Sequence, residues 1–382
     1  MFDKPFDDWR PRTPEGRWAG FGPYYAMFPV SFARAVIGRF SCEGDTVIDP
    51  FCGRGTTNFV AQAMGRHSLG CELNPVGWLY ATTKTRPARQ LGRILMRIDQ
   101  IAALRVESDY IPENEFQDWA WCRDVLAFLN SARRNLDWRR SKVDRTIAAI
   151  MLVSLHAKIG GGLSNQMRQC KSLSPEYSVR WWRQRGMRPP ALDPAGFLKA
   201  RVKWRYAKGF VDATCEAQVF LGDARRKLKR YAGDPASLVL TSPPYSGVTN
   251  YRYDNWIRLW ALGEGPSLPN GAPGHRYGHQ GRYRALIHEA FATTSRKTRE
   301  DAAVFVRTDA RRFTLETTIA AMRSAWPHLM LYGRTTKARQ LTQTALFGDR
   351  STKPGETDLV ALPCGTRPPV EFVEVGTRTL SS

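Results

Sequence analysis

Two periods of apolar residues alternate along the chain. Segments of strand length, most of them largely apolar and bounded by turn residues, occupy positions 46–48, 67–72, 217–221, 237–240, 302–306, 329–331 and 358–362. Helical spacing of apolar positions occurs between them, at 30–40, 58–64, 225–231, 250–262 and 315–326. Strands that are apolar on both faces and alternate with helices are typical of an α/β fold with a mostly parallel sheet. The last two runs predict a closing hairpin.

The middle of the chain has a different pattern. Helical periodicity covers residues 91–104, 116–136 and 143–159, the last of them strongly apolar, before three glycines at 160–162. No strand-length apolar run is evident there. The pattern predicts one sheet-containing domain formed by residues 1–89 and 211–382, interrupted by a helical insertion at 90–210. The segment 266–282 is rich in Gly and Pro and is expected to be a loop.

Composition narrows the classes of protein that are possible. No apolar run approaches the roughly 20 residues of a membrane-spanning helix, and the first residues lack the apolar core of a signal peptide. The seven cysteines form no Cys-x-x-Cys pair, which argues against a disulfide framework and a structural zinc site. We therefore expect a cytoplasmic protein, without a membrane partner and without a metal.

The charge indicates a polyanionic partner. The chain has 57 Lys and Arg against 35 Asp and Glu, a formal net charge of +22. Between positions 121 and 210 there are 19 Lys and Arg but 5 Asp and Glu, so +14 of this charge lies in the predicted insertion. Trp and Tyr are interleaved with these cations, a combination that suits phosphate contacts and base stacking. Nucleic acid is the expected partner.

A glycine loop follows the first strand. Its sequence, Asp49-Pro-Phe-Cys-Gly-Arg-Gly-Thr-Thr57, precedes a helix, so the glycines can bring the backbone close to a ligand. The loop lacks the Gly-Lys-Ser/Thr of a P-loop and the third glycine of the dinucleotide motif. An acid directly before the loop suits a cationic ligand group. Glu72, at the end of the second strand, is well placed for a ribose diol.

A sharp corner in the chain is expected directly after the run at 237–240. Residues 241–245 read Thr-Ser-Pro-Pro-Tyr, and two prolines end a strand because each fixes φ and lacks an N–H donor. The corner would present the Ser242 hydroxyl, a backbone carbonyl and the Tyr245 ring at the carboxyl edge of the sheet. The ring could stack on a flat heterocycle while the oxygens accept hydrogen bonds from its exocyclic amine.

Together, the loop at 49–57 and the corner at 241–245 resemble the S-adenosyl-L-methionine loop and the catalytic motif of amino-group DNA methyltransferases, the DNA methylase N-4/N-6 family. Serine before Pro-Pro-Tyr resembles the cytosine-N4 branch, whereas the adenine-N6 branch usually has Asp or Asn there. The resemblance implies a seven-stranded, mostly parallel methyltransferase sheet with S-adenosyl-L-methionine as the cofactor. It also implies transfer of a methyl group to the N4 amine of a cytosine flipped out of duplex DNA, in a restriction-modification or related system, with a cognate restriction endonuclease as a possible genetic partner.

The resemblance assigns roles residue by residue. Asp49 is expected to hold the methionine ammonium, Glu72 the ribose hydroxyls and Asp223 the adenine amine. The target-base pocket is expected to contain Ser242, Pro243, Pro244 and Tyr245. The other residues expected at the cofactor are Tyr25, Phe28, Pro29, Pro50, Phe51, Gly53, Gly55, Thr56, Thr57, Leu73, Asn74 and Ala224.

Candidates for DNA contact come from the insertion and from the segment after the catalytic corner. Asn, Gln and Arg side chains can read base edges, and Arg, Lys and aromatic residues contact phosphates and bases. The candidates are Asn165, Gln166, Arg168, Lys171, Arg180, Trp181, Trp182, Arg183, Tyr251 and Arg252.

Three alternatives remain open from the sequence. Adenine-N6 methylation of DNA is the first, and methylation of an amino group in RNA is the second. The third is a DNA-binding module that keeps the cofactor as a structural or regulatory ligand. The intact Ser-Pro-Pro-Tyr corner beside an intact glycine loop argues against the third.

Overall fold

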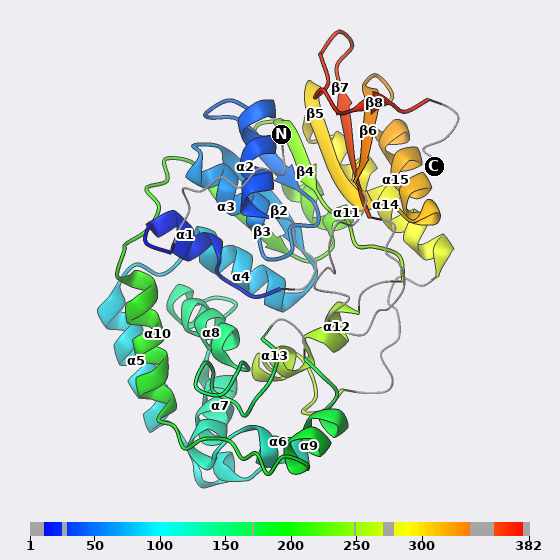
Figure 1. Cartoon of the computed structure of the whole chain (residues 1–382). Coiled ribbons are helices and arrows are strands. Elements are labelled where there is room, and N and C mark those ends of the chain that lie inside the picture. Colours follow the sequence, from blue (N-terminus) through cyan, green and yellow to red (C-terminus); the bar gives the residue numbers. More distant parts are fainter. Residues whose placement is uncertain are drawn as a thin grey trace.

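The computed structural model describes residues 11–24, 29–169, 172–247, 250–269, 279–336 and 355–376. Its centre is an eight-stranded sheet of order β3-β2-β1-β4-β5-β7-β6-β8 (Figure 1). The first five strands in this order are parallel, and β7 enters antiparallel between β5 and β6. The strands are β1 (Thr46–Asp49), β2 (His67–Glu72), β3 (Ala217–Leu221), β4 (Ala236–Thr241), β5 (Thr298–Asp309), β6 (Met330–Thr336), β7 (Glu356–Leu362) and β8 (Val373–Glu374).

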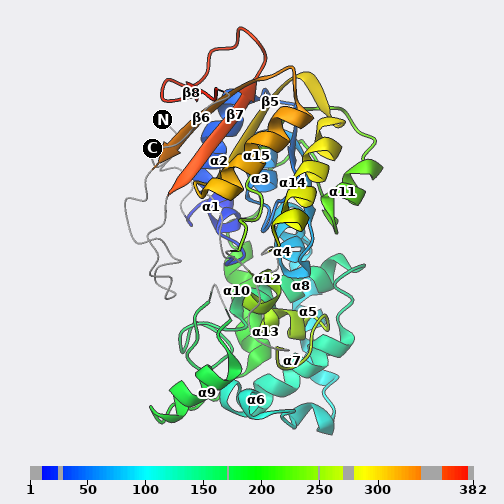
Figure 2. The same cartoon turned by 90° about the vertical axis from the view of Figure 1, so that its right-hand side faces the viewer.

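Helices cover both faces of the sheet, which explains why its central strands are apolar throughout. On one face α2 (Val30–Phe40) packs beside α3 (Thr56–Ala63) over β1, β4 and β5. On the other face α14 (Gln280–Ser295) and α15 (Arg312–Ala325) pack together over β4, β5 and β7 (Figure 2). The short α11 (Ala224–Lys227) covers β1 and β2 on this second side.

The predicted insertion is helical. It forms one end of the elongated molecule, and the sheet forms the other (Figures 1 and 2). Its elements are α5 (Leu91–Ala103), η1 (Glu107–Tyr110), α6 (Glu115–Ala120), α7 (Arg123–Asn135), α8 (Lys142–Ser154), α9 (Pro175–Arg183) and α10 (Pro194–Tyr206).

One helix from outside the insertion joins its core. α12 (Tyr251–Asp254) and α13 (Trp256–Ala261) follow the segment 241–245 in sequence, and α13 belongs to the hydrophobic cluster of the insertion. The Trp260 ring stacks on Trp121 with centroids 5.0 Å apart, and Trp256 meets Phe116 edge-on at 4.9 Å. One hydrophobic cluster therefore contains the insertion, α13 and parts of α1 (Pro14–Ala19) and α4 (Pro75–Thr85). The domain boundaries at 89/90 and 210/211 stay a prediction.

The structure confirms the α/β class and the mostly parallel sheet but corrects several elements. There are eight strands instead of seven, because the two-residue β8 pairs with the free edge of β6. α4 was not predicted, since a proline shortly after a strand is typical of a turn. The Asn74 side chain instead accepts from the Val76 N–H, and Pro75 occupies the first helical turn, so the pair starts a helix. α9, α10 and α14 were also not predicted.

Within the part of the chain that the structure describes, no helix combines the length and the apolar character needed to span a membrane.

Candidate active site

The glycine loop and the proline corner lie next to each other. β1 pairs in parallel with β4, with Val47 opposite Leu238 and Ile48 opposite Val239, so both strands end at the same edge. A cavity at this edge is lined by residues of both segments, Phe51 and Gly53 from the loop and Ser242 and Pro244 from the corner. The spatial arrangement expected from the sequence is therefore present.

The enclosed part of this cavity is small, about 90 Å³. Typical ligand pockets measure about 300–1,000 Å³, so a ligand of cofactor size would extend beyond the enclosed part. The ends of β2 and β3 complete the wall. The lining includes Tyr24, Pro50, Phe51, Gly53, Cys71, Glu72, Leu73, Asn74, Gly222, Asp223, Ala224, Ser242, Pro244 and Leu286.

Glycines allow the loop to pack tightly. Gly55 has φ +73° and forms the N-cap of α3. A Cβ atom built on Gly55 would lie 2.6 Å from the Cβ of Ala81 in α4, closer than real Cβ contacts. Glycine is therefore required here by both conformation and space. Gly53, with φ +53°, lines the cavity with its backbone.

Asp49 is buried and connects the two motifs. Its Oδ1 accepts hydrogen bonds from Thr241 Oγ1 at 2.6 Å and from the Phe51 N–H at 3.1 Å, and its Oδ2 accepts from Thr57 Oγ1 at 2.7 Å. The side chain does not line the cavity, and the residue is 2% exposed. The direct contact with a methionine ammonium that the sequence suggested stays a prediction, and the contacts present here are internal. Asp49 holds the glycine loop against the strand end that carries Ser242.

Burial affects the acidity of both carboxyl groups in this region. It raises the pKa of Asp49 to about 6, although the three hydrogen bonds act in the opposite direction. It raises the pKa of Glu72 to about 7, against the lowering effect of backbone N–H groups that include Asn74. Glu72 Oε1 accepts from the Asn74 N–H at 2.6 Å. Unlike Asp49, Glu72 lines the cavity, so its carboxylate can receive a ligand hydroxyl.

The pKa of Asp223 is lowered by its contacts with Arg225. Its carboxylate accepts from the Arg225 backbone N–H and pairs with the Arg225 guanidinium, with Nη2 and Oδ2 2.6 Å apart. Burial acts to raise the pKa of Asp223, but the hydrogen bonds and positive charge of Arg225 outweigh it and lower the pKa. Asp223 lines the cavity at the end of β3, on the far side of Glu72 from the catalytic corner.

The corner at 241–245 exposes Ser242 to the cavity, whereas Tyr245 is not part of the lining. The Tyr245 side chain hydrogen-bonds to Ser242, and burial raises the pKa of its phenol. Tyr245 does not line the cavity, and its charged neighbours are Glu356, Arg307 and Asp309 from β5 and β7. Pro244 lines the cavity, whereas Pro243 is buried behind it.

Comparison with known proteins identifies a family match for the N-terminal segment, which contains the glycine loop. Residues 4–77 match a family model described as DNA methylase. This segment contains the glycine loop and Glu72. The resemblance to the DNA methylase family is confirmed.

Curated relatives match over short stretches. The chain is 43% identical to the Type II methyltransferase M.SmaI of Serratia marcescens over 53 residues, 14% of this chain and 18% of the relative. It is 45% identical over 49 residues to M.MthZI of Methanothermobacter thermautotrophicus, 13% of this chain and 14% of the relative. It is 26% identical over 125 residues to M.BsoBI of Geobacillus stearothermophilus, 31% of this chain and 24% of the relative. The chain thus spans less than a quarter of the length of these Type II methyltransferases.

Solved structures match over most of their length but loosely. The rRNA methyltransferase aviRa from Streptomyces viridochromogenes is 12% identical, with 94% of each chain covered and a TM-score of 0.37. A TehB-like SAM-dependent methyltransferase from Corynebacterium glutamicum is 10% identical, with 87% and 86% covered and a TM-score of 0.31.

The cofactor of the DNA methylase family is S-adenosyl-L-methionine, and the donors of this cavity suit it. Acids stand at the ends of two neighbouring strands, Glu72 on β2 and Asp223 on β3, and can accept from a ribose diol and an adenine amine. Gly53 and Gly222 leave the backbone accessible between them. Of the residues that the sequence assigned to the cofactor, those lining the cavity are Pro50, Phe51, Gly53, Glu72, Leu73, Asn74, Asp223 and Ala224.

The remaining cofactor candidates do not line the cavity or lie outside the described residues. Gly55, Thr56 and Thr57 shape the loop from behind, since they are not in the lining and both threonines are buried. Pro29 is exposed at the start of α2 and does not line the cavity, and Tyr25 and Phe28 lie outside the described residues.

Some residues in the wall of the cavity were not predicted from the sequence. Leu286, from α14, reaches the cavity from a helix that was not predicted. Tyr24 and Cys71 also line it, and each is adjacent in sequence to a residue that was named as a candidate. No group of three or more His, Cys, Asp and Glu side chains is placed to hold a metal ion anywhere in the described residues.

Several of the residues expected to contact DNA are structural. Asn165 is fully buried, and its amide donates to the carbonyls of Trp119 and Met187. Trp182 is buried and donates from its indole to the Gln166 carbonyl. Both are therefore corrected: they hold the loop at 160–169 against α9 and cannot reach a base.

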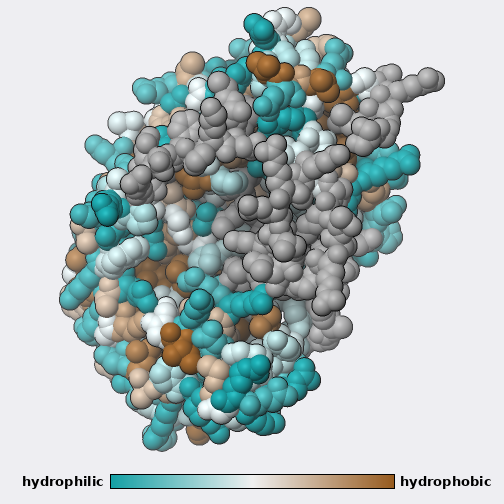
Figure 3. Space-filling view, viewed as in Figure 1, coloured by the Kyte–Doolittle hydropathy of each residue, from teal (hydrophilic) through white to brown (hydrophobic). Residues whose placement is uncertain are grey.

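Other DNA candidates remain accessible. Arg168, Arg180, Arg183 and Arg252 are exposed, Trp181 and Gln166 are half-buried, and the Gln166 amide oxygen accepts from the Ile159 N–H. Hydrophilic residues predominate along the lower margin of the helical region (Figure 3). Lys171 and the side chain of Tyr251 lie outside what the structure describes.

Proposed function

We propose that the protein is an amino-group DNA methyltransferase, and that its target is the N4 amine of cytosine. The observation that carries the proposal is the cavity that Glu72, Asp223 and Ser242 line together. Two carboxylates that could bind the methyl donor and a hydroxyl that could bind the target amine therefore lie at the same edge of the sheet. The DNA methylase match over residues 4–77 and the names of the Type II relatives support the same chemistry.

In this proposal each residue has a limited task. When bound, S-adenosyl-L-methionine supplies a methyl group activated by its sulfonium centre. Glu72 and Asp223 accept hydrogen bonds from the nucleoside part, and the backbone at Gly53 lies against the ligand. Asp49 keeps the glycine loop and the strand end of Ser242 in fixed relation through Thr241 and Thr57.

Ser242 acts on the target amine. Its hydroxyl accepts a hydrogen bond from the exocyclic NH2, which aims the nitrogen lone pair toward the methyl donor. Tyr245 holds the Ser242 side chain through their hydrogen bond, so we propose a positioning role for Tyr245 in place of base stacking. The amine itself is the nucleophile, and catalysis is mainly positioning and exclusion of water.

The basic helical region binds the duplex and offsets the cost of extruding a base. That cost is a few kcal/mol, and contacts of Lys and Arg with phosphates release counterions. Arg180 on α9 and Arg252 on α12 are exposed cations suited to this purpose, and Arg183 on α9 is exposed but pairs with Glu115. The proposal implies a cytoplasmic enzyme and a restriction endonuclease as genetic partner.

The test is nucleoside analysis of reaction products. Purified protein is incubated with a labelled methyl donor and either duplex DNA or total RNA, and the nucleosides are identified by mass spectrometry after digestion. N4-methylcytosine from duplex DNA is the expected product. N6-methyladenine would reject the cytosine assignment, label in RNA alone would reject the DNA assignment, and an absence of label in both would reject the proposed activity.

A further inference from the structure

A second cavity lies at the other end of α4. It encloses about 210 Å³ and lies between the sheet domain and the helical region. α4 starts beside Asn74 of the first cavity and ends at Thr85 in the second. The 11 residues of this helix separate the two cavities by roughly 16 Å at 1.5 Å per residue, and the two linings have no residue in common.

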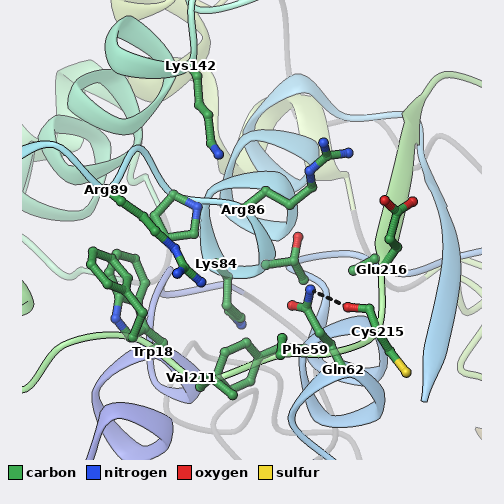
Figure 4. A pocket seen from close by; sticks show the side chains of 15 residues that line it. Trp18, Phe59, Gln62, Lys84, Arg86, Arg89, Lys142, Val211, Cys215 and Glu216 are labelled. Carbon is green, nitrogen blue, oxygen red and sulfur yellow. Dashed lines mark hydrogen bonds between the residues drawn. The ribbon is translucent and has the colours of Figure 1, made fainter. Parts of the chain in front are cut away.

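Four cations line this second cavity. Lys84 comes from α4, Arg86 and Arg89 from the segment after it, and Lys142 from the start of α8 (Figure 4). Arg86, Arg89 and Lys142 are exposed, whereas Lys84 is 2% exposed. The side chains therefore form a buried base, which is Lys84, and an accessible rim of three basic residues.

The Lys84 ammonium nitrogen lacks a partner within the described structure. It is buried and makes no hydrogen bond there. Burial, together with the neighbouring charges of Arg54 and Arg205, places the pKa of Lys84 well below its usual range. A buried polar group without a partner costs about 1–3 kcal/mol, and an apolar side chain of similar length would avoid that cost.

The basic side chains at the rim of the cavity also form no ion pairs with acids among the described residues. Burial and the charges of Arg86, Arg89 and Arg145 lower the pKa of Lys142. Among the described residues, no carboxylate forms an ion pair with Lys84, Arg86, Arg89 or Lys142, and this includes Glu216 in the same lining. Because Glu216 does not pair with these cations, a bound anion would stabilise them.

The remaining wall is rigid and partly aromatic. Trp18 stacks on Phe210 with ring centroids 5.7 Å apart, and its indole donates to the Gly209 carbonyl. The Arg89 guanidinium lies 5.4 Å from the Phe210 ring centroid. A volume of 210 Å³ corresponds to about seven water molecules at roughly 30 Å³ each, enough for a phosphate group with a small ester but not for a dinucleotide.

We propose that this second cavity is a binding site for a phosphate-bearing anion, held by Lys84 at its base and by Arg86, Arg89 and Lys142 at its rim. The anion would bridge the sheet domain, through α4, and the helical region, through α8. It is either the phosphate of a small free ester or a phosphate of the DNA backbone. Neither source depends on methyl transfer, so the site can exist even where the proposed catalytic function fails.

The test uses inorganic phosphate and isothermal titration calorimetry at constant ionic strength, with chloride as the balancing anion. The wild-type protein is expected to bind phosphate saturably. Lys84→Met, which removes the buried charge but keeps the length, should weaken binding roughly tenfold or more, as for loss of a charge-assisted hydrogen bond. The double variant Arg86→Gln/Lys142→Gln should also weaken it, and it changes only exposed side chains.

The matched control is Lys229→Gln, an exposed cation on the sheet domain far from this lining, which should bind like the wild type. If wild-type protein shows no saturable phosphate binding, or if the rim variant binds unchanged, the proposal is overturned. Competition assigns the source of the anion. If added inorganic phosphate displaces labelled duplex DNA at fixed ionic strength, the site binds a phosphate of the DNA backbone. If inorganic phosphate binds without displacing the DNA, the site binds a small free ester.

Discussion

At the scale of single residues, Glu72 gives the candidate site a pH dependence. Its pKa is raised to about 7, so it is protonated below that pH and loses an acceptor for a ribose hydroxyl. Adenosine has the ribose diol but no titrating amino acid group. Its affinity should fall roughly tenfold from about pH 8 to about pH 6, because the fraction of ionised Glu72 falls by that factor.

The matched variant for this effect is Glu72→Gln. It should bind adenosine more weakly than the wild type and with no change over the same pH range, as measured by calorimetry. Asp223 should add no dependence, since Arg225 keeps its pKa low. Equal wild-type affinity at both pH values would show that the Glu72 carboxylate does not receive the ribose.

Asp49 should affect stability more directly than binding. Its carboxylate accepts three hydrogen bonds inside the protein, and Asp49→Asn places an amide N–H2 opposite some of these donors. We expect a loss of about 1–3 kcal/mol in the free energy of unfolding, measured by urea denaturation. Thr57→Val, which removes one donor, should cost less, and the two changes should not be additive.

A contrary result would restore the role that the sequence suggested for Asp49. That result is an Asp49→Asn protein with wild-type stability but lost affinity for S-adenosyl-L-methionine. It would mean that the carboxylate leaves its internal partners and meets the ligand directly.

The sequence located the residues of the site better than their orientations. Glu72, Asp223 and Ser242 were predictable because each follows a strand whose end must lie at the sheet edge. Asp49 and Asn165 were assigned to ligands because acids and amides suit them chemically. Their burial depends on partners distant in sequence, such as Thr241 and Trp119, which no local pattern reveals.

At the scale of elements, the turn into α3 requires glycine. Gly55→Ala should destabilise the protein by more than about 1–3 kcal/mol, since it adds a clash with Ala81 to an unfavourable φ. Gly44→Ala is the control, because Gly44 has φ +81° but no atom within 4 Å of the added Cβ. Thermal unfolding should show a clearly larger decrease for Gly55→Ala. Equal decreases would mean that α4 moves aside without cost.

Strands were easier to predict than helices in this chain. The buried strands are continuous apolar runs, and the β6–β7 hairpin was recognised from two of them. α4 is buried on nearly all sides, so it has no polar face to produce helical periodicity. The helix predicted at 116–136 is divided, because Trp121 adopts an extended conformation between α6 and α7 and its ring enters the core.

At the scale of the whole molecule, the charge imbalance predicts salt-sensitive DNA binding. Arg180→Ala and Arg252→Ala should each weaken binding to duplexes of any sequence and reduce the slope of log affinity against log salt by about one. Fluorescence anisotropy over a range of salt concentrations measures both effects. Lys229→Gln serves again as the control cation. Slopes unchanged from the wild type would place the duplex elsewhere on the surface.

The helical region shares a hydrophobic core with α13. α13 follows the corner in sequence and packs its tryptophans against Trp121 and Phe116. The sequence assigned residues 250–262 to the sheet domain, because a helix between two strands normally covers the sheet. In the structure α13 instead packs against the aromatic residues of the insertion. DNA bound by the helical region would thus contact a unit that includes α13, the helix that follows the segment 241–245 in sequence.

The most direct measurement of the central claim separates cofactor binding from methyl transfer in Ser242→Ala. The account predicts that this variant binds S-adenosyl-L-methionine with wild-type affinity and loses most methyl transfer to duplex DNA, while Ser237→Ala on the same strand retains both. Full methyl transfer by Ser242→Ala would contradict the account, because the hydroxyl in the shared cavity would then have no part in the reaction.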